Sequence, residues 1–213
     1  MSYRGPTQQE IHEIASEVNR EFSSCNLSCC FVGGTGCMLY GCSRTPNYDQ
    51  EVLKSTLVTY GNKFYPRPSQ QPGATWQVLY YRLSGDGRAA CKVDVLTPGV
   101  MNIPIISSDR IVKVSRLPVM PLIPLLLLKL QAWDDHRKSD RSDFQAKGPA
   151  DVNDVLQSVA ICRSQWKRLT HPVACYLSSP FIDAGKIRVM KFMQATRETH
   201  GSTFYDWKVL GLC

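Results

Sequence analysis

The 213-residue sequence has no long uninterrupted apolar run and no apolar leader. Its most apolar stretch, Leu117–Leu130, is interrupted by three prolines and is too short to cross a bilayer. The first ten residues, MSYRGPTQQE, are polar and lack the apolar core of a signal peptide. We therefore expect no membrane anchor and a cytoplasmic location.

The spacing of cysteine and histidine typical of zinc sites is also missing. The chain has nine cysteines and four histidines, but no two cysteines have CxxC spacing, and no histidine lies near the cluster Cys25–Cys42. Cys29, Cys30 and Cys91 stand in apolar runs, where a reduced thiol packs as a small hydrophobic side chain. We predict reduced cysteines and no structural zinc.

The charges do not form a basic or acidic block. Lys and Arg number 25 against 18 Asp and Glu, which gives a formal net charge of +7, and both signs alternate between residues 129 and 147. A basic balance favours anionic partners such as nucleotides and nucleic acids. Because the signs are interleaved, we expect a generally basic surface rather than a dedicated nucleic-acid arm.

The first third of the chain predicts a helix, a strand and a second, short helix. Thr7 followed by Glu10 is a capping box. Apolar residues then recur at helical spacing and predict one buried face: Ile11, Ile14, Ala15, Val18 and Phe22. Leu27–Val32 is expected to form a buried strand that runs into Gly33-Gly34-Thr35, and a short helix behind the glycines is expected to end at Gly41.

The middle of the chain predicts strands. Thr75–Leu83 and Ala90–Leu96 are strand-like and flank the turn Ser84–Gly87, so we expect a β-hairpin. Ile111–Val114 is expected to add an edge strand. Asn62–Gly73 contains three prolines and is expected to be a loop.

Helical spacing dominates the second half, over Leu125–Arg137, Ala150–Arg163 and Phe181–Arg197. The predicted fold class is therefore α/β (α+β), a small mixed sheet with flanking helices and a C-terminal helical region. We expect an α/β domain at 1–116 and a helical region at 117–213 packed on it.

A strand that ends in two glycines before a helix can bind an anion. The glycines allow close approach of the backbone, and the helix start presents free N–H groups. Gly33, Gly34 and Thr35 are therefore candidate phosphate-binding residues. The alternative is that the same turn is only a connector.

The run FVGGTGCMLYGCSRTPN, residues 31–47, resembles the signature of the nucleotidyltransferase superfamily. In the minimal nucleotidyltransferase and AbiEii-toxin-like branches, the Gly-Gly turn is followed by Tyr-Gly and then Arg, as Tyr40, Gly41 and Arg44 are here. The segment CKVDVL is similar to the strand that carries the third acidic residue of the family, which would be Asp94.

Two later segments extend the resemblance through about residue 156, and the sequence is most similar to small fungal members of the group. LLLLKLQAWDDHR and KGPADVNDV resemble helical elements of the family. Their corresponding residues would be Lys129, Arg137, Lys147, Asp151 and Asp154.

The resemblance implies transfer of a nucleoside monophosphate from an NTP to an acceptor, which would be a small molecule, an RNA or a protein. Two Mg²⁺ or Mn²⁺ ions would be held by three carboxylates, Asp94 among them. The implied nucleotide-binding residues are Gly33, Gly34, Thr35, Arg44, Lys129 and Arg137.

The sequence departs from the family at the acid-x-acid pair that should follow the Arg. Asp49 and Glu51 are the available candidates. On a strand, residues two apart share a face, whereas on a helix they point about 200° apart. The segment 49–58 has helix-spaced apolar residues, so we expect the strand with the pair to be missing, the sheet to have a gap and the metal site to be incomplete. A shortened natural variant and a wrongly spliced gene model both fit this departure.

Three functions from different classes follow. The chain is an active nucleotidyltransferase, or a pseudoenzyme that binds a nucleotide or a protein without turnover, or a basic RNA-binding protein that uses its helical half. For single residues, Asp94 in an apolar strand needs Lys92 or a metal as partner. Lys129 either extends its ammonium group to solvent or contacts phosphate, and Arg137 and Asp154 are either ion-pair or substrate residues.

Overall fold

The computed structural model describes residues 6–41, 54, 57–59, 61–69, 73–83, 89–170, 174–201 and 204–213. The fold is mixed α/β, as expected: helices predominate, and short strands form one three-stranded and one two-stranded sheet. No described helix is both long and apolar enough to cross a membrane.

Helix α1, Gln8–Ser24, begins at the predicted capping box. The Thr7 hydroxyl accepts a hydrogen bond from the Glu10 backbone N–H, and the Glu10 carboxylate accepts one from the Thr7 backbone N–H at 2.7 Å. The apolar face predicted from the spacing is buried. It packs on the three-stranded sheet and closes the N-terminal hydrophobic core.

The strand expected at 27–32 is not formed, and this expectation is wrong. Only Phe31 has a β-bridge, a parallel one to Val119. The Phe31 N–H donates to the Pro118 carbonyl at 2.8 Å, and the Met120 N–H donates to the Phe31 carbonyl at 3.1 Å. An apolar run becomes a strand only where a ladder of partners exists, and the described residues provide one partner position.

Helix α2, Gly33–Leu39, follows directly and includes the glycines in its first turn. Gly41, predicted to end it, lies just beyond its end with a φ of 104°, which suits glycine.

The main sheet consists of β1, Phe64–Pro68, β2, Gln77–Arg82, and β3, Ala90–Val93, in the order β1-β2-β3 and antiparallel throughout. The β2–β3 pairing confirms the predicted antiparallel partners, with Leu79 opposite Val93. The turn residues 84–88 lie outside the described chain.

Strand β1 corrects the prediction of a loop at 62–73. Pro66 and Pro68 lie in β1 and pair with Leu79 and Gln77. Proline has no N–H to donate, which confines it to sheet edges, and β1 is an edge strand of the sheet that the described residues form. Because one side of β1 needs no donors, the proline content does not prevent a strand here.

A second, separate hairpin joins β4, Val112–Val114, to β5, Leu117–Val119. β4 confirms the predicted strand, although its partner is β5 rather than the main sheet. Ser115 and Arg116 connect the two strands, both with positive φ, as in a tight two-residue hairpin turn. The hairpin crosses residue 116, and the division expected there stays a prediction.

The second half is helical, and its three longest helices confirm the predicted ones. They are α4, Leu122–Lys138, α6, Gly148–Ser164, and α8, Ser179–Ala195. The short helices are α5, Ser142–Gln145, α9, Arg197–His200, and α10, Phe204–Val209. Two 3₁₀ turns, Val100–Asn102 and Ser108–Arg110, precede them in the chain.

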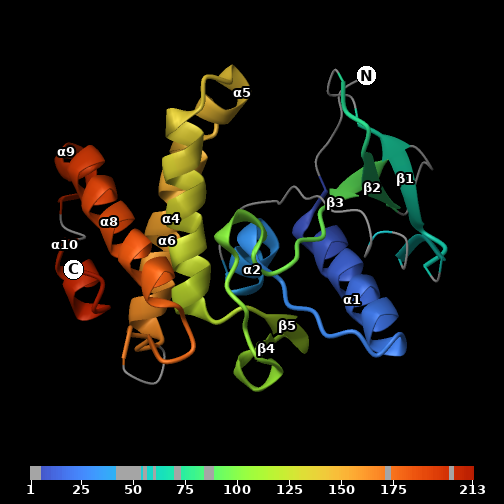
Figure 1. Ribbon diagram of the computed structural model, residues 1–213, viewed down its shortest axis with the longest axis horizontal. Helices are drawn as coiled ribbons and strands as arrows, with labels where there is room; N and C mark the ends of the chain where they lie inside the picture. The colour runs from blue at the N-terminus through green and yellow to red at the C-terminus, as the bar shows by residue number, and fades with distance from the viewer. Residues whose placement is uncertain are drawn as a thin grey trace.

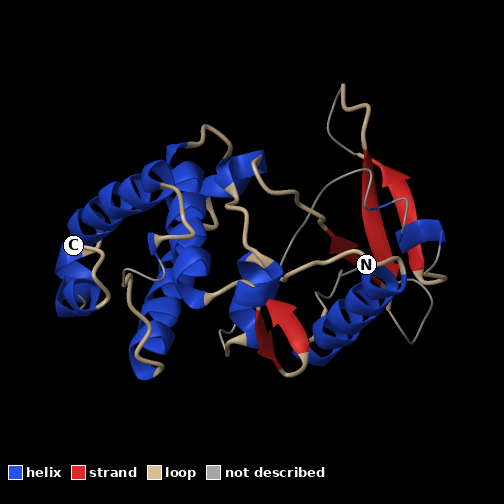
Figure 2. Ribbon diagram, turned by 60° about the horizontal axis from the view of Figure 1, so that its bottom comes forward, coloured by secondary structure: helices blue, strands red, loops and turns tan. Residues whose placement is uncertain are grey.

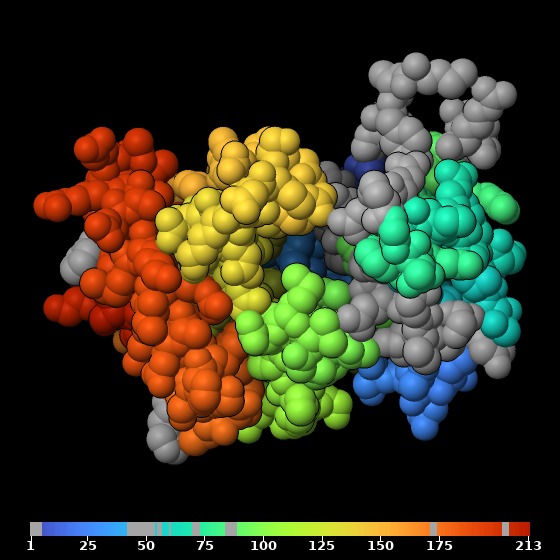
Figure 3. Space-filling model, turned by 45° about the horizontal axis from the view of Figure 1, so that its top comes forward, coloured from blue at the N-terminus to red at the C-terminus, as the bar shows by residue number. Residues whose placement is uncertain are grey.

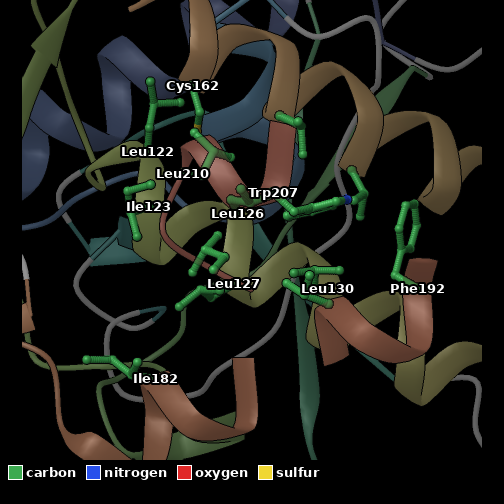
Figure 4. Close-up of a cluster of buried hydrophobic side chains, with 14 of the residues drawn as sticks. Leu122, Ile123, Leu126, Leu127, Leu130, Cys162, Ile182, Phe192, Trp207 and Leu210 are labelled. Carbon is green, nitrogen blue, oxygen red and sulfur yellow. The ribbon is translucent and has the colours of Figure 1, made fainter. Parts of the chain in front are cut away.

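Helix α4 is the centre of the helical half, since it packs against both α6 and α8. Figure 4 shows Leu126, Leu127 and Leu130 of α4 gathered with Phe192 of α8 and Trp207 of α10. These side chains are almost completely buried. A helix buried on nearly all sides explains why residues 122–130 are so uniformly apolar.

The two halves lie at opposite ends of the molecule, with α2 and the β4–β5 hairpin between them (Figure 1). Figure 2 shows the strands near α1 and α2, and only helices and loops at the other end. Helix α2 packs against α4, where Cys37 meets Met120 and Leu125 in a small hydrophobic cluster. The diglycine motif therefore lies on the element that links the two halves.

Candidate functional site

A cavity of about 280 Å³ lies between α1, the segment 27–35 and β3 with the residues that follow it. Most of its wall is apolar and includes Ile14, Phe31 and Val93. Its polar wall includes Thr35, Lys92 and Asp94. The cavity thus brings together segments from three separate parts of the sequence.

Two backbone segments, β3 and the residues around Phe31, both contribute to the wall of this cavity. Within the described chain, β3 is an edge of its sheet, with β2 as partner, and Phe31 bonds to β5. The sequence predicts a gap in the sheet where the strand with the acidic pair would belong. The residues that decide this point, Asp49 and Glu51, lie outside the described residues, as does Arg44.

Asp94 is held against Lys92. Its carboxylate Oδ1 lies 2.8 Å from Lys92 Nζ, and the Asp94 side chain is 7% exposed against 33% for Lys92. The prediction that Lys92 could be the partner of Asp94 is therefore confirmed. Cys91 and Val93 alternate with these two residues along the strand, belong to the N-terminal hydrophobic core and also line the cavity. Burial, and secondarily the Asp94 charge, raises the pKa of Cys91 to about 11.

The diglycine segment is shaped by close packing. A Cβ at Gly36 would lie 2.8 Å from the Phe31 carbonyl oxygen, so only glycine lets α2 lie this close to the backbone of Phe31. Gly33 has a φ of 58°, which also suits glycine. Thr35 is buried and lines the cavity, whereas Gly33 and Gly34, at the start of α2, are not among its lining residues.

The predicted residues of the helical half do not line the cavity. Lys129 Nζ lies 2.6 Å from Asp154 Oδ2, and both side chains are buried, so the expectation that this lysine extends its ammonium group to solvent is wrong. Arg137 lies 2.7 Å from the carboxylate of Asp134. A buried charge needs a partner, and these pairs supply it. Nucleotide contact by Lys129 or Arg137 stays a prediction.

The remaining charged residues of this region form pairs within α4 and one pair between α4 and α6. His136 Nδ1 lies 2.6 Å from Asp151 Oδ2, and its ring stacks on Phe144. Burial opposes ionisation of Asp134, but hydrogen bonds from Lys138 and Arg137 outweigh it and lower the pKa of this carboxyl below its usual value. The network fixes helix packing rather than lining a cavity.

Lys92 is a cavity residue that sequence reasoning did not assign to the nucleotide site. Among the described lining residues it is the single cationic side chain. The available signal was the alternation in CKVDVL, which places Lys92 on the same face as Asp94. Nothing in the sequence indicates that the apolar face of α1 forms part of the cavity wall.

The carboxylates of the described chain do not fit the two-ion site that the resemblance implies. Asp94 is the one described carboxylate in the cavity wall, and its charge is offset by the Lys92 ammonium. The described residues contain no group of three or more His, Cys, Asp or Glu able to hold a metal ion. A two-ion site needs carboxylates that bridge both ions, so no step through a metal follows from these residues.

The eight described cysteines are free thiols, as predicted. Burial raises the pKa of Cys30 to about 11 and that of Cys162 to about 12, so both remain protonated at neutral pH. The structure therefore does not support a thiolate nucleophile at either position.

Comparison of the chain with family models, curated proteins and solved structures finds no match.

Proposed function

We propose that this chain is a nucleotidyltransferase-like protein that binds a nucleoside triphosphate in the cavity beside β3. One observation carries the proposal: Thr35 of the diglycine motif and Asp94 line the same cavity although they are far apart in the sequence. The resemblance expects these two parts of the family signature to face one nucleotide. If the diglycine turn were only a connector and Asp94 an unrelated aspartate, nothing would require both to line one cavity.

The lining of the cavity suits the two parts of a nucleotide. Apolar side chains of α1, such as Ile14 and Val18, offer a surface for the base. Lys92 offers an ammonium group, still one-third exposed, for a phosphate. In this proposal Lys92 turns from Asp94 to the phosphate when the nucleotide binds.

The activity that accompanies binding is transfer of the nucleoside monophosphate to a small molecule, an RNA or a protein. In the family this transfer uses three carboxylates, so in this chain it depends on Asp49 and Glu51 together with Asp94. The test is incubation of the full chain with each labelled NTP and Mg²⁺ or Mn²⁺. Transfer that is lost in Asp94→Ala and kept in Asp109→Ala, an exposed aspartate, supports the enzyme.

Binding is tested separately by titration with each NTP. Lys92→Ala is expected to weaken binding about 10-fold or more, since it removes a charge-assisted hydrogen bond. Lys113→Ala, an exposed lysine on β4, serves as the matched control and should bind normally. Absence of saturable binding for every NTP would refute the proposal.

The pairing of Lys92 with Asp94 favours a second candidate, a pseudoenzyme that binds a nucleotide without turnover. An ammonium group that already neutralises the acidic residue leaves less charge for a metal ion. Nucleotide binding that is indifferent to EDTA and yields no label transfer would select this candidate over the enzyme.

A further inference from the structure

Trp166 follows the end of α6 in a conformation that favours glycine. The Lys167 N–H donates to the Cys162 carbonyl at 2.8 Å, and the Trp166 N–H donates to the Arg163 carbonyl at 3.0 Å. These two bonds are the Schellman pattern, in which Trp166 holds the left-handed position. Its φ is 53°, which costs free energy for a residue with a Cβ atom.

Burial does not compensate for this backbone cost. The Trp166 side chain is 79% exposed, more than any other large hydrophobic side chain of the described chain. A tryptophan that is neither buried nor suited to its backbone contributes little to folding. Such a position indicates a role on the surface, because strained residues concentrate at functional sites.

A groove lies beside Trp166, between the end of α6 and α10. Its volume is about 360 Å³, and its wall includes three cationic side chains, Arg163, Lys167 and Arg168. All three are exposed. One carboxylate, Asp206, also lines the groove and pairs with Arg163. The described lining therefore has a net positive charge.

A second exposed aromatic ring stands beside the groove. Tyr205 of α10 is 63% exposed, and the Arg163 guanidinium lies 5.6 Å from the centroid of its ring. The walls are well anchored: Trp207 of α10 and Leu210, which directly follows α10, are buried in the helical core (Figure 4). The Leu169 N–H also donates to the Leu210 carbonyl at 2.8 Å, which ties the segment after Trp166 to the residue that follows α10.

We propose that this groove binds single-stranded nucleic acid, with Trp166 and Tyr205 stacking on bases and Arg163, Lys167 and Arg168 contacting phosphates. Exposed aromatic rings combined with a cationic groove are the means by which proteins hold unpaired strands. A duplex keeps its bases stacked on each other and offers no face to these rings. The net charge of +7 supports a polyanionic partner.

The test is fluorescence anisotropy of the full chain with labelled 12-nucleotide oligouridylate and oligothymidylate. Trp166→Gly is the decisive variant because glycine is the preferred residue at this helix position. We expect this variant to keep or raise the melting temperature, yet to bind about 10-fold more weakly or worse. Trp166→Phe, which retains a ring, should recover much of the lost affinity.

The charge contribution is tested by the salt dependence. Three phosphate contacts predict a slope of about −2 for log K against log salt concentration. Lys167→Glu should weaken binding and flatten this slope, whereas Lys186→Glu, the same change at an exposed position on α8, should do neither. Tighter binding of the uridylate or of the thymidylate identifies the strand as RNA or DNA, and either result supports the groove.

Three results would overturn the inference. One is the absence of binding at low salt, and another is binding that Trp166→Gly leaves unchanged. The third is equal or tighter binding of a 12-base-pair duplex, of polyglutamate or of anionic lipid vesicles. In that case the groove recognises negative charge in general, or a different class of partner.

Figure 3 shows another hollow of the molecule, between the yellow helical segment and the light-green segment, with blue atoms of the N-terminal region at its base. The groove beside Trp166 belongs instead to the end of α6 and to α10. A variant of Trp166 therefore leaves the cavity residues Thr35, Lys92 and Asp94 unchanged, and failure of one proposal does not imply failure of the other.

Discussion

At the scale of single residues, the helical half depends on charges buried in pairs. Lys129 on α4 and Asp154 on α6 lie 2.6 Å apart with almost no exposure. Such a pair gains little over a well-packed apolar pair, but removal of one partner leaves the other charge buried and uncompensated. The pair therefore fixes how α4 meets α6.

Asp154→Ala is expected to lower the free energy of unfolding by about 3–5 kcal/mol, because it leaves the Lys129 ammonium buried. The measurement is urea denaturation followed by circular dichroism. Asp183→Ala, an exposed aspartate on α8, should change stability by no more than about 0.5 kcal/mol. The double variant Lys129→Met/Asp154→Leu should recover most of the loss. A single variant as stable as the wild type would contradict the account.

The pH dependence of stability reports on Asp134. Hydrogen bonds from Lys138 and Arg137 overcome the effect of burial and lower the pKa of this carboxyl from its ordinary 3.8, and Lys191 of α8 also faces it at 3.6 Å. A lowered pKa contributes stability above the ordinary value and loses it as pH falls through the folded value. The stability difference between wild type and Asp134→Asn should therefore be largest at neutral pH and shrink below about pH 4.

Urea titrations at neutral pH and at several values below 4 measure this difference. Other carboxyl groups titrate in both proteins, so their effects cancel in the comparison. A difference that stays constant through the acidic range would mean that the ion pairs of Asp134 do not stabilise the fold.

Some residue roles follow from sequence and others do not. The alternation in CKVDVL predicted that Lys92 could meet Asp94, because strand geometry fixes which neighbours share a face. The pairing of Lys129 with Asp154 depends on how two helices pack, which the spacing of either helix does not contain. The positive φ of Trp166 could not be predicted from the sequence, because it depends on the residue at which α6 ends.

At the scale of elements, α2 packs closely against the backbone of Phe31 because Gly36 has no side chain. Gly36 lies against the Phe31 carbonyl, and a Cβ there would come within 2.8 Å of it. That carbonyl also accepts the Met120 N–H, so it cannot move freely. Gly36→Ala is expected to lower the melting temperature and the free energy of unfolding by about 1–3 kcal/mol.

Gly201→Ala is the matched control, since Gly201 also has a right-handed helical backbone and nothing lies within 4 Å of the position that a Cβ would take there. This variant should be neutral or more stable, by up to about 1 kcal/mol. Thermal unfolding of both variants measures the contrast. Equal effects at the two glycines would show that the contact between α2 and Phe31 is not tight.

Element prediction succeeded where the signal is local. The capping box and apolar face of α1 and the three long helices of the second half are properties of short windows of sequence. The strand expected at 27–32 failed because a strand needs neighbours, and the described residues offer Phe31 one bridge partner position. Strand β1 was missed because prolines argue against a strand, although an edge strand tolerates them.

At the scale of the whole molecule, the cavity arises from the meeting of three distant segments. From the sequence alone, only the resemblance to the nucleotidyltransferases predicted that Gly33–Thr35 and Asp94 belong to one site. The apolar wall from α1 could not be predicted, since it depends on how α1 packs across the sheet. The candidate site is therefore a property of the tertiary fold.

The central claim is that a nucleoside triphosphate binds in this cavity, and hydrogen exchange measured by mass spectrometry tests it most directly. The full chain is compared with and without each NTP. We expect slower exchange at residues 30–37 and 90–97, which contribute to the walls of the cavity, and a smaller effect in Lys92→Ala. Unchanged exchange in both segments at saturating concentrations of every NTP would contradict it.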